Sequence, residues 1–191
     1  MLESHILNSR IKNIAMDLKP QDLLVMLKAA AHPQRRWTYA ALGEALLMTA
    51  SQVHASVKRA VTAGLAAEHG RGEWEPILPA LLEFAVHGAR YAYAAVPGPV
   101  KRGVPTSFGV APLSEQISAP PGEVPVWADP AGTVRGPSLS PLYRSAPKAA
   151  LADPALHRLL ALLDALRSGR TRERALAAAL LEHELRNDAG Q

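Results

Sequence analysis

The side chains whose chemistry and spacing are most informative lie between Arg36 and Arg71. They are hydroxyls, an amide, a histidine, lysine and arginine, in an order that fits no catalytic set. Hydroxyl and amide groups can hydrogen-bond the edges of bases in the major groove of DNA, and lysine and arginine neutralise phosphates. The candidate contact residues are Arg36, Thr38, Thr49, Ser51, Gln52, His54, Ala55, Ser56, Lys58, Arg59 and Arg71.

Catalysis has little support in the sequence. The seven histidines are scattered, and His183-Glu184 lacks the second histidine of a zinc-protease motif. There is no nucleophile elbow, no P-loop and no glycine fingerprint for a dinucleotide. The chain has no cysteine, which excludes disulfides and thiolate metal sites. We therefore expect no catalytic residue, no metal and no cofactor. An enzyme with an unrecognised site in Val96–Arg144 is the lesser alternative.

Two predicted helices would position the candidate residues. Thr38 can cap a short helix that ends near Leu47. Thr49 then opens a second helix, in which Gln52 completes a Thr-x-x-Gln capping box, and Gly64 ends it. The turn between the two helices is short, which is typical of a helix-turn-helix.

The orientation of the second helix decides which side chains face outward. If Val53 and Val57 face the first helix, the polar and basic residues from Ser51 to Arg59 lie on the outer faces. Three aromatic residues flank these elements and could stack on bases, but we expect them to pack in the core: Trp37, Tyr39 and Trp74.

A small antiparallel ribbon is predicted after the second helix. Leu65–Glu68 can form one strand, His69–Gly72 a tight basic turn, and Glu73–Glu75 the returning strand. Such a ribbon directly after a recognition helix is a wing. Arg71 at its tip would lie near the phosphates or in the minor groove.

This order of elements resembles the winged helix-turn-helix of bacterial transcription regulators, the MarR-like type especially. The resemblance covers Leu18–Glu75 and rests on the helix order, the turn length, the caps and the wing. It implies that the residues nearest the bases are Ser51, Gln52, Ala55 and Arg59, with Arg71 in the wing. Downstream, a proline-rich region stands where MarR proteins have long dimerisation helices.

Helices are predicted on both sides of the proline-rich region. Leu7, Ile11, Ile14 and Leu18 form one apolar helical stripe, and Pro20 begins a second helix that extends to Ala31. At the other end of the chain, the predicted helices are Ala155–Arg167 and Thr171–Arg186.

The region from Pro97 to Pro154 holds twelve of the sixteen prolines, which makes long helices improbable there. Glu123–Trp127 and Thr133–Arg135 resemble strands and flank an Asp-Pro-x-Gly turn, so a small hairpin is predicted. The segment Gly98–Ser118 fits either an ordered loop or a linker.

The expected fold class is mainly α with small β elements, an α+β protein. Residues 1–93 would form the winged helix-turn-helix domain with its N-terminal helix, residues 94–154 a proline-rich loop or small β region, and residues 155–191 a C-terminal helical pair.

These features predict a sequence-specific regulator, a repressor, that binds double-stranded DNA as a homodimer. The net charge of +4 would not indicate nucleic-acid binding on its own.

The dimer interface is expected on two apolar stripes, Leu7–Ile14 and Leu156–Leu166, although both could instead cover the middle region. The absence of a signal peptide and of a bilayer-length apolar stretch favours the cytoplasm and no membrane contact. The nature of any effector stays open. The main alternative is a protein-interaction module of antitoxin or assembly-factor type.

Overall fold

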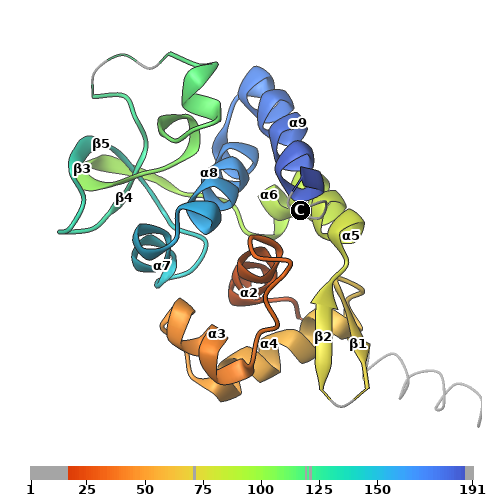
Figure 1. Cartoon of the computed structure of the whole chain (residues 1–191). Helices are drawn as coiled ribbons and strands as arrows, with labels where there is room; N and C mark the ends of the chain where they lie inside the picture. The colour runs from red at the N-terminus through yellow and green to blue at the C-terminus, as the bar shows by residue number, and fades with distance from the viewer. Residues whose placement is uncertain (1–16, 71, 119, 121, 188–191) are drawn as a thin grey trace, which may run out of the picture.

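The computed structural model describes residues 17–70, 72–118, 120 and 122–187 and has an α+β fold, in which most of the helices lie between two small sheets (Figure 1). The first half contains α2 (Pro20–Ala30), α3 (Tyr39–Leu46), α4 (Ala50–Thr62), β1 (Ala66–His69), β2 (Glu73–Pro76), α5 (Leu78–Glu83), the π-helix η1 (Phe84–Gly88) and α6 (Ala89–Ala92). The second half contains β3 (Pro97–Pro105), the 3₁₀ turns η2 (Ser107–Gly109) and η3 (Leu113–Glu115), β4 (Val126–Ala128), β5 (Val134–Leu139), α7 (Ala146–Ala152), α8 (Pro154–Ser168) and α9 (Thr171–Asn187).

The two helices predicted between Thr38 and Gly64 are confirmed together with their caps. The Thr38 hydroxyl accepts a hydrogen bond from the backbone of Ala41 at 3.1 Å and begins α3. Thr49 begins α4, and its reciprocal capping box with Gln52 is complete. Gly64 follows α4 with a φ of +75°, a conformation that glycine adopts without the strain of a side chain.

The small ribbon predicted after the second helix, which we call the wing, is confirmed as antiparallel. β1 and β2 pair from Ala66 opposite Pro76 to His69 opposite Glu73. The ribbon extends away from the helices at the same end of the molecule as α4 (Figure 1). Arg71, the predicted tip contact, lies outside the described residues.

The hairpin predicted in the middle region is wrong in its pairing. The Asp-Pro-x-Gly turn does form, because Gly132 donates its backbone N–H to the carbonyl of Asp129 at 3.0 Å. However, β4 and β5 do not form a hairpin: each pairs antiparallel with β3, and they meet one another only in parallel, at Val126 and Ser138. Gly98–Ser118 was expected to be an ordered loop or a linker, but it contributes most of β3 (Pro97–Pro105), whose prolines hide the strand pattern.

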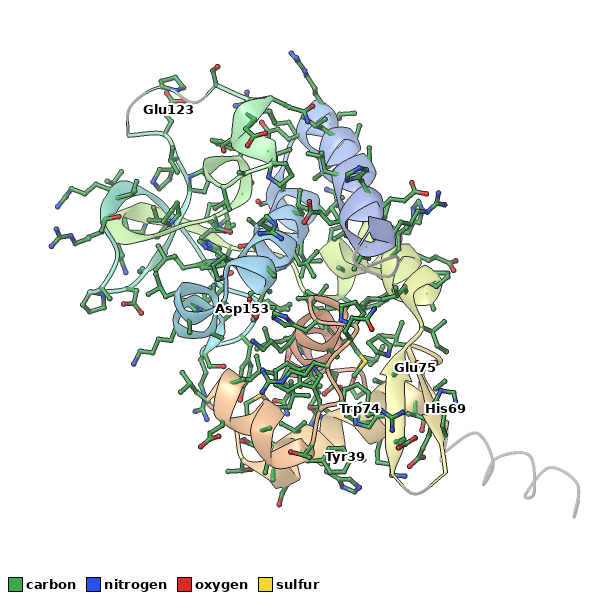
Figure 2. The ribbon with its side chains drawn as sticks, viewed as in Figure 1. Tyr39, His69, Trp74, Glu75, Glu123 and Asp153 are labelled. Atoms are coloured by element: carbon green, nitrogen blue, oxygen red, sulfur yellow. The ribbon has the colours of Figure 1, made fainter. Side chains whose placement is uncertain are left out.

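The two predicted C-terminal helices are confirmed as α8 and α9. Asp153, labelled in Figure 2, connects α8 with α2. One of its oxygens caps α8 by accepting from the backbone of Ala155 and Leu156, and the other accepts from Lys28 at 2.5 Å and His32 at 2.7 Å. Burial alone would raise the pKa of Asp153, but the hydrogen bonds from Lys28, His32 and Leu156 outweigh burial and lower the pKa to about 2.

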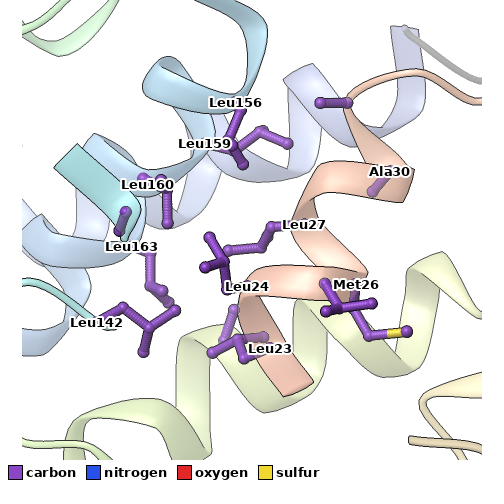
Figure 3. Close-up of a cluster of buried hydrophobic side chains, with 14 of the residues drawn as sticks. Leu23, Leu24, Met26, Leu27, Ala30, Leu142, Leu156, Leu159, Leu160 and Leu163 are labelled. Atoms are coloured by element: carbon purple, nitrogen blue, oxygen red, sulfur yellow. The ribbon is translucent and has the colours of Figure 1, made fainter. Parts of the chain in front are cut away.

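α8 is the central helix of the molecule and is apolar on almost every side. Its leucines pack directly against α2, where Leu23, Leu24 and Leu27 face them (Figure 3). Each of the six leucines from Leu156 to Leu166 is at most 2% exposed. The prediction that the Leu156–Leu166 stripe forms a dimer interface is therefore wrong, because these side chains are already buried within one chain. The other expected stripe, Leu7–Ile14, lies outside the described residues.

One hydrophobic cluster runs from α2 and α4 through α8 to α9. The helices α2 to α4 and the C-terminal helices thus share a core, which fixes their relative position. None of the helices in the described part of the chain combines the length and the apolar composition needed to cross a bilayer.

Candidate nucleic-acid interface

The outer face of α4 is set by how the helix packs. Val53 and Val57 are 0% and 2% exposed and lie against α2 and α3, as predicted. The opposite side carries Ser51, His54 and Lys58, all of them exposed. Their spacing of three and four residues places these three side chains on one face of the helix.

Several other predicted contact residues are also accessible. Gln52 and Ala55 are half-buried at the edges of the same face. Three further predicted contact residues are exposed but lie away from this face of α4. Arg36 is in the loop before α3, and Thr38 and Thr49 are the N-terminal caps of α3 and α4. The Gln52 side-chain oxygen accepts from the backbone of Thr49 at 2.9 Å, so it serves the cap, and its amide nitrogen is the group left to donate outward.

The expectation that Ser56 faces outward is wrong. Ser56 is 0% exposed and lies on the buried face of α4 together with Val53, Val57 and Ala60. This buried face is wider than the positions of the two valines alone would indicate. Its hydroxyl accepts a hydrogen bond from Arg59 at 3.3 Å, so the buried oxygen has a partner.

Arg59 is likewise not available on the outer face. Its guanidinium binds both oxygens of Asp22 on α2, at 2.6 and 2.7 Å, and its side chain is only 18% exposed. The hydrogen bond that Arg59 donates to Asp22 raises the pKa of Arg59. Because Asp22 is fully buried, moving Arg59 to a phosphate would leave an unpaired buried carboxylate, at a cost of about 3–5 kcal/mol. Arg59 therefore fixes α4 on α2.

Asp22 itself was missed by sequence reasoning. It accepts from the backbone of Lys19 at 2.8 Å in the first turn of α2, which is a common place for an acidic residue. Its second role, as the partner of Arg59, arises because the fold brings together two residues that are 37 positions apart in the sequence.

The cations that remain on this side are paired with acids of the wing. Lys58 contacts Glu68 at 3.0 Å, and Arg36 contacts Glu73 at 2.7 Å. Exposed pairs of this kind contribute about 0.2–1 kcal/mol, so they exchange partners easily. The wing also holds His69 against Glu75 on its surface, at 3.0 Å (Figure 2).

The aromatic residues near the interface serve the packing, as expected. Trp37, Tyr39 and Trp74 are half-buried and lie against the core. The guanidinium of Arg35 lies 3.8 Å from the ring centre of Trp37, which holds this arginine against the protein. Tyr39, the first residue of α3 (Figure 2), meets His54 edge-on, with the ring centroids 5.0 Å apart, and so orients the histidine ring.

A second polar cluster lies far from α4, around Asp164 in the middle of α8. Its carboxylate accepts from Trp127 at 2.6 Å, Thr106 at 2.9 Å and Arg167 at 2.6 Å. Burial raises the pKa of Asp164, while Arg167 and the hydrogen bonds oppose that rise. Asp164, Thr106 and Trp127 are each at most 1% exposed, so the cluster joins α8 to the β3–β5 sheet and has no access for a substrate. Within the described residues, no group of three or more potential ligands is positioned to hold a metal ion.

No family model, curated protein or solved structure matches this chain. The similarity to MarR-like regulators, and what it implies for function, therefore stays a prediction from the sequence.

Proposed function

We propose that this protein binds double-stranded DNA, with α4 in the major groove and the β1–β2 wing beside the backbone, and that it regulates transcription as a repressor. The observation that carries the proposal is the exposed stripe of Ser51, His54 and Lys58 on a helix that is capped, packed and followed by a wing. In this arrangement Ser51 and His54 would reach base edges. Lys58, one turn farther along α4, would neutralise a phosphate.

The local charge is compatible with this role. Lys58 and Arg36 are held only by exposed ion pairs, which DNA phosphates can replace at little cost. The Arg59–Asp22 pair keeps the helix rigid on α2, so its outer face is presented in one orientation. As a homodimer, the protein would place two such helices about 34–36 Å apart and would read a two-fold symmetric site.

A second candidate function is binding of a protein partner through the same face, as an antitoxin-like or assembly module. The observation that favours it is the acidity of the wing, where Glu68 and Glu73 already neutralise the cations beside α4. Such a face has little excess positive charge for a phosphate backbone.

Selection of bound sequences from a random duplex pool tests the proposal directly. We expect recovery of a defined motif, and affinity for that duplex that falls steeply with rising salt, because bound phosphates release counterions. Recovery of no motif, with salt-insensitive binding, would favour the protein partner instead.

Two neighbouring lysine and arginine residues provide a matched pair of variants. Lys58→Ala should reduce the slope of affinity against salt by about one unit and leave the fold unchanged. Arg59→Ala should instead lower the free energy of unfolding by about 3–5 kcal/mol, because it strands Asp22. A reduced salt slope for Arg59→Ala in a protein of normal stability would contradict this assignment.

A further inference from the structure

A group of exposed cations lies on the β3–β5 sheet and on the segment that follows it. Residues 97–114 and 134–152 contain five lysines and arginines and no acidic residue. All five are exposed: Lys101, Arg102, Arg135, Arg144 and Lys148. Figure 1 shows this sheet at the edge of the molecule away from the β1–β2 wing. The cations of the sheet are therefore separate from the face of α4 described above.

Two of these arginines are directly opposed on the sheet. Arg102 of β3 lies opposite Arg135 of β5 in an antiparallel pair, which puts both side chains on one face with their Cβ atoms about 4.5–5.5 Å apart. Like charges in this position repel and weaken the pairing of the strands. Among the described residues, no acidic side chain forms an ion pair with either arginine. Both guanidinium groups are thus available to bind one anion together, and a bound anion would relieve their repulsion.

The backbone beside the two arginines is fixed by close crossings of the strands. Each arginine is followed by a glycine, Gly103 on β3 and Gly136 on β5. A Cβ at Gly103 would collide with the carbonyl oxygen of Trp127, and one at Gly136 would collide with the carbonyl oxygen of Val124. The two strands are therefore held in one arrangement by contacts that a side chain would disrupt. This reduces the ordering that an anion would have to impose when it binds.

The anion that fits this surface best is the backbone of a nucleic acid. Guanidinium groups bind phosphate oxygens with paired hydrogen bonds. Five exposed cations exceed the needs of a single phosphate, whereas duplex DNA carries one negative charge for every ~1.7 Å of its axis. The centre of a protein interface is instead depleted of charge and enriched in aromatic residues. Within β3 and β5, which are described in full, Val100 is the only exposed large apolar side chain.

This surface also supplies what the α4 face lacks. Lys58 and Arg36 beside α4 are paired with Glu68 and Glu73, so a phosphate has to replace an acid at each of them. The sequence-independent part of DNA affinity comes from cations that neutralise phosphates. Cations of the β3–β5 sheet can provide it without first breaking an ion pair.

We propose that the β3–β5 sheet binds the phosphate backbone of double-stranded DNA, through Arg102 and Arg135, as a sequence-independent contact separate from α4. The choice of DNA as the polyanion rests on the proposed function, but the contact itself does not require α4 to read bases. Lys101 precedes Arg102 on the other face of β3 and adds to the attraction.

A salt titration of the full-length protein with a labelled pool of random-sequence duplexes tests this contact, because α4 has no common site to read in such a pool. Arg102→Ala/Arg135→Ala should lower the slope of log affinity against log salt by about two units. Arg102→Lys/Arg135→Lys keeps both charges and should keep the slope. Arg170→Ala/Arg172→Ala removes the same charge from exposed positions near the start of α9 and should change the slope by less than about half a unit.

The melting temperature separates this effect from a loss of folding. Arg102→Ala/Arg135→Ala removes a repulsion between strands, so it should melt at or above the temperature of the wild-type protein. A variant that melts lower and binds DNA with the wild-type slope would show that the two arginines serve the fold, and would overturn the proposal.

Two further results would overturn the proposal. The first is an equal slope for the alanine variants at Arg102/Arg135 and at Arg170/Arg172. The second is an unchanged slope for Arg102→Ala/Arg135→Ala together with loss of binding to polyglutamate, which would assign the surface to an acidic protein. A failure of the α4 assignment looks different: selection would recover no motif, while Arg102→Ala/Arg135→Ala would still lower the slope, and the contact proposed here would stand.

Discussion

The contact between Asp153 and Lys28 should be a major support of the shared core, and Asp153→Asn tests it. Asparagine keeps the cap on α8, because its side-chain oxygen can still accept from Ala155 and Leu156. It removes the negative charge, however, and leaves the Lys28 ammonium without its carboxylate. The side chains of Lys28 and Asp153 are only 7% and 8% exposed, so water cannot replace the lost partner well.

The expected loss is about 3 kcal/mol, because breaking one side of a buried pair costs about 3–5 kcal/mol and His32 is partly open to solvent. In a chain of this size that corresponds to a melting temperature lower by about 6–12 °C. Urea denaturation followed by circular dichroism measures the change. The Lys28→Met/Asp153→Asn variant should regain at least half of the loss, because it removes both charges together.

The pH dependence of the same variants gives a second test. The pKa of Asp153 is lowered from 3.8 to about 2, so the ion pair stabilises the fold fully above about pH 4 and loses this effect as the pH falls through 2. The shift corresponds to about 2 kcal/mol. The gap in stability between the wild-type protein and Asp153→Asn should therefore shrink by about that amount between pH 5 and pH 2. A gap below about 0.5 kcal/mol at pH 7, or one that does not change with pH, would refute this reasoning.

Two further predictions concern packing. A Cβ at Gly43 would lie 2.6 Å from the carbonyl oxygen of Met48, so Gly43→Ala should lower the free energy of unfolding by about 1–3 kcal/mol. Gly70 has open space around it, so Gly70→Ala is the control and should change the free energy of unfolding by less than about 0.5 kcal/mol in the same urea titration. Leu160→Glu places a charge at a position that is 1% exposed, so it should unfold the chain, which is measured as loss of helical circular dichroism. If the variant were instead a folded monomer, the Leu156–Leu166 stripe would again be a candidate subunit interface.

The elements that could be predicted from the sequence are those fixed by local interactions. The caps at Thr38 and Thr49, the glycine after α4 and the wing strands all depend on residues a few positions apart. α8 was also predicted, because the chain from Ala155 onward is free of proline and rich in leucine and alanine, which favour helix.

The incorrect or missing predictions depend on contacts between distant segments. Arg59 has the sequence appearance of a surface cation, and only the arrival of Asp22 from α2 turns it inward. The leucines of α8 fit a dimer interface equally well until α2 and α9 are known to cover them. β3 has prolines at both ends and no alternating pattern, so its pairing with β4 and β5 could not be read locally.

The most direct test of DNA binding by α4 is the affinity of Ser51→Glu for the selected duplex, measured by fluorescence anisotropy. A glutamate in the first turn of α4 favours the helix dipole, so the fold should be unaffected or slightly more stable. In the groove the same charge would face phosphates and should weaken binding by about 100-fold. Ser114→Glu, an equal change at an exposed site remote from α4, is the control and should leave the affinity unchanged. Equal affinity for Ser51→Glu and Ser114→Glu in folded protein would contradict the assignment of α4 to the major groove.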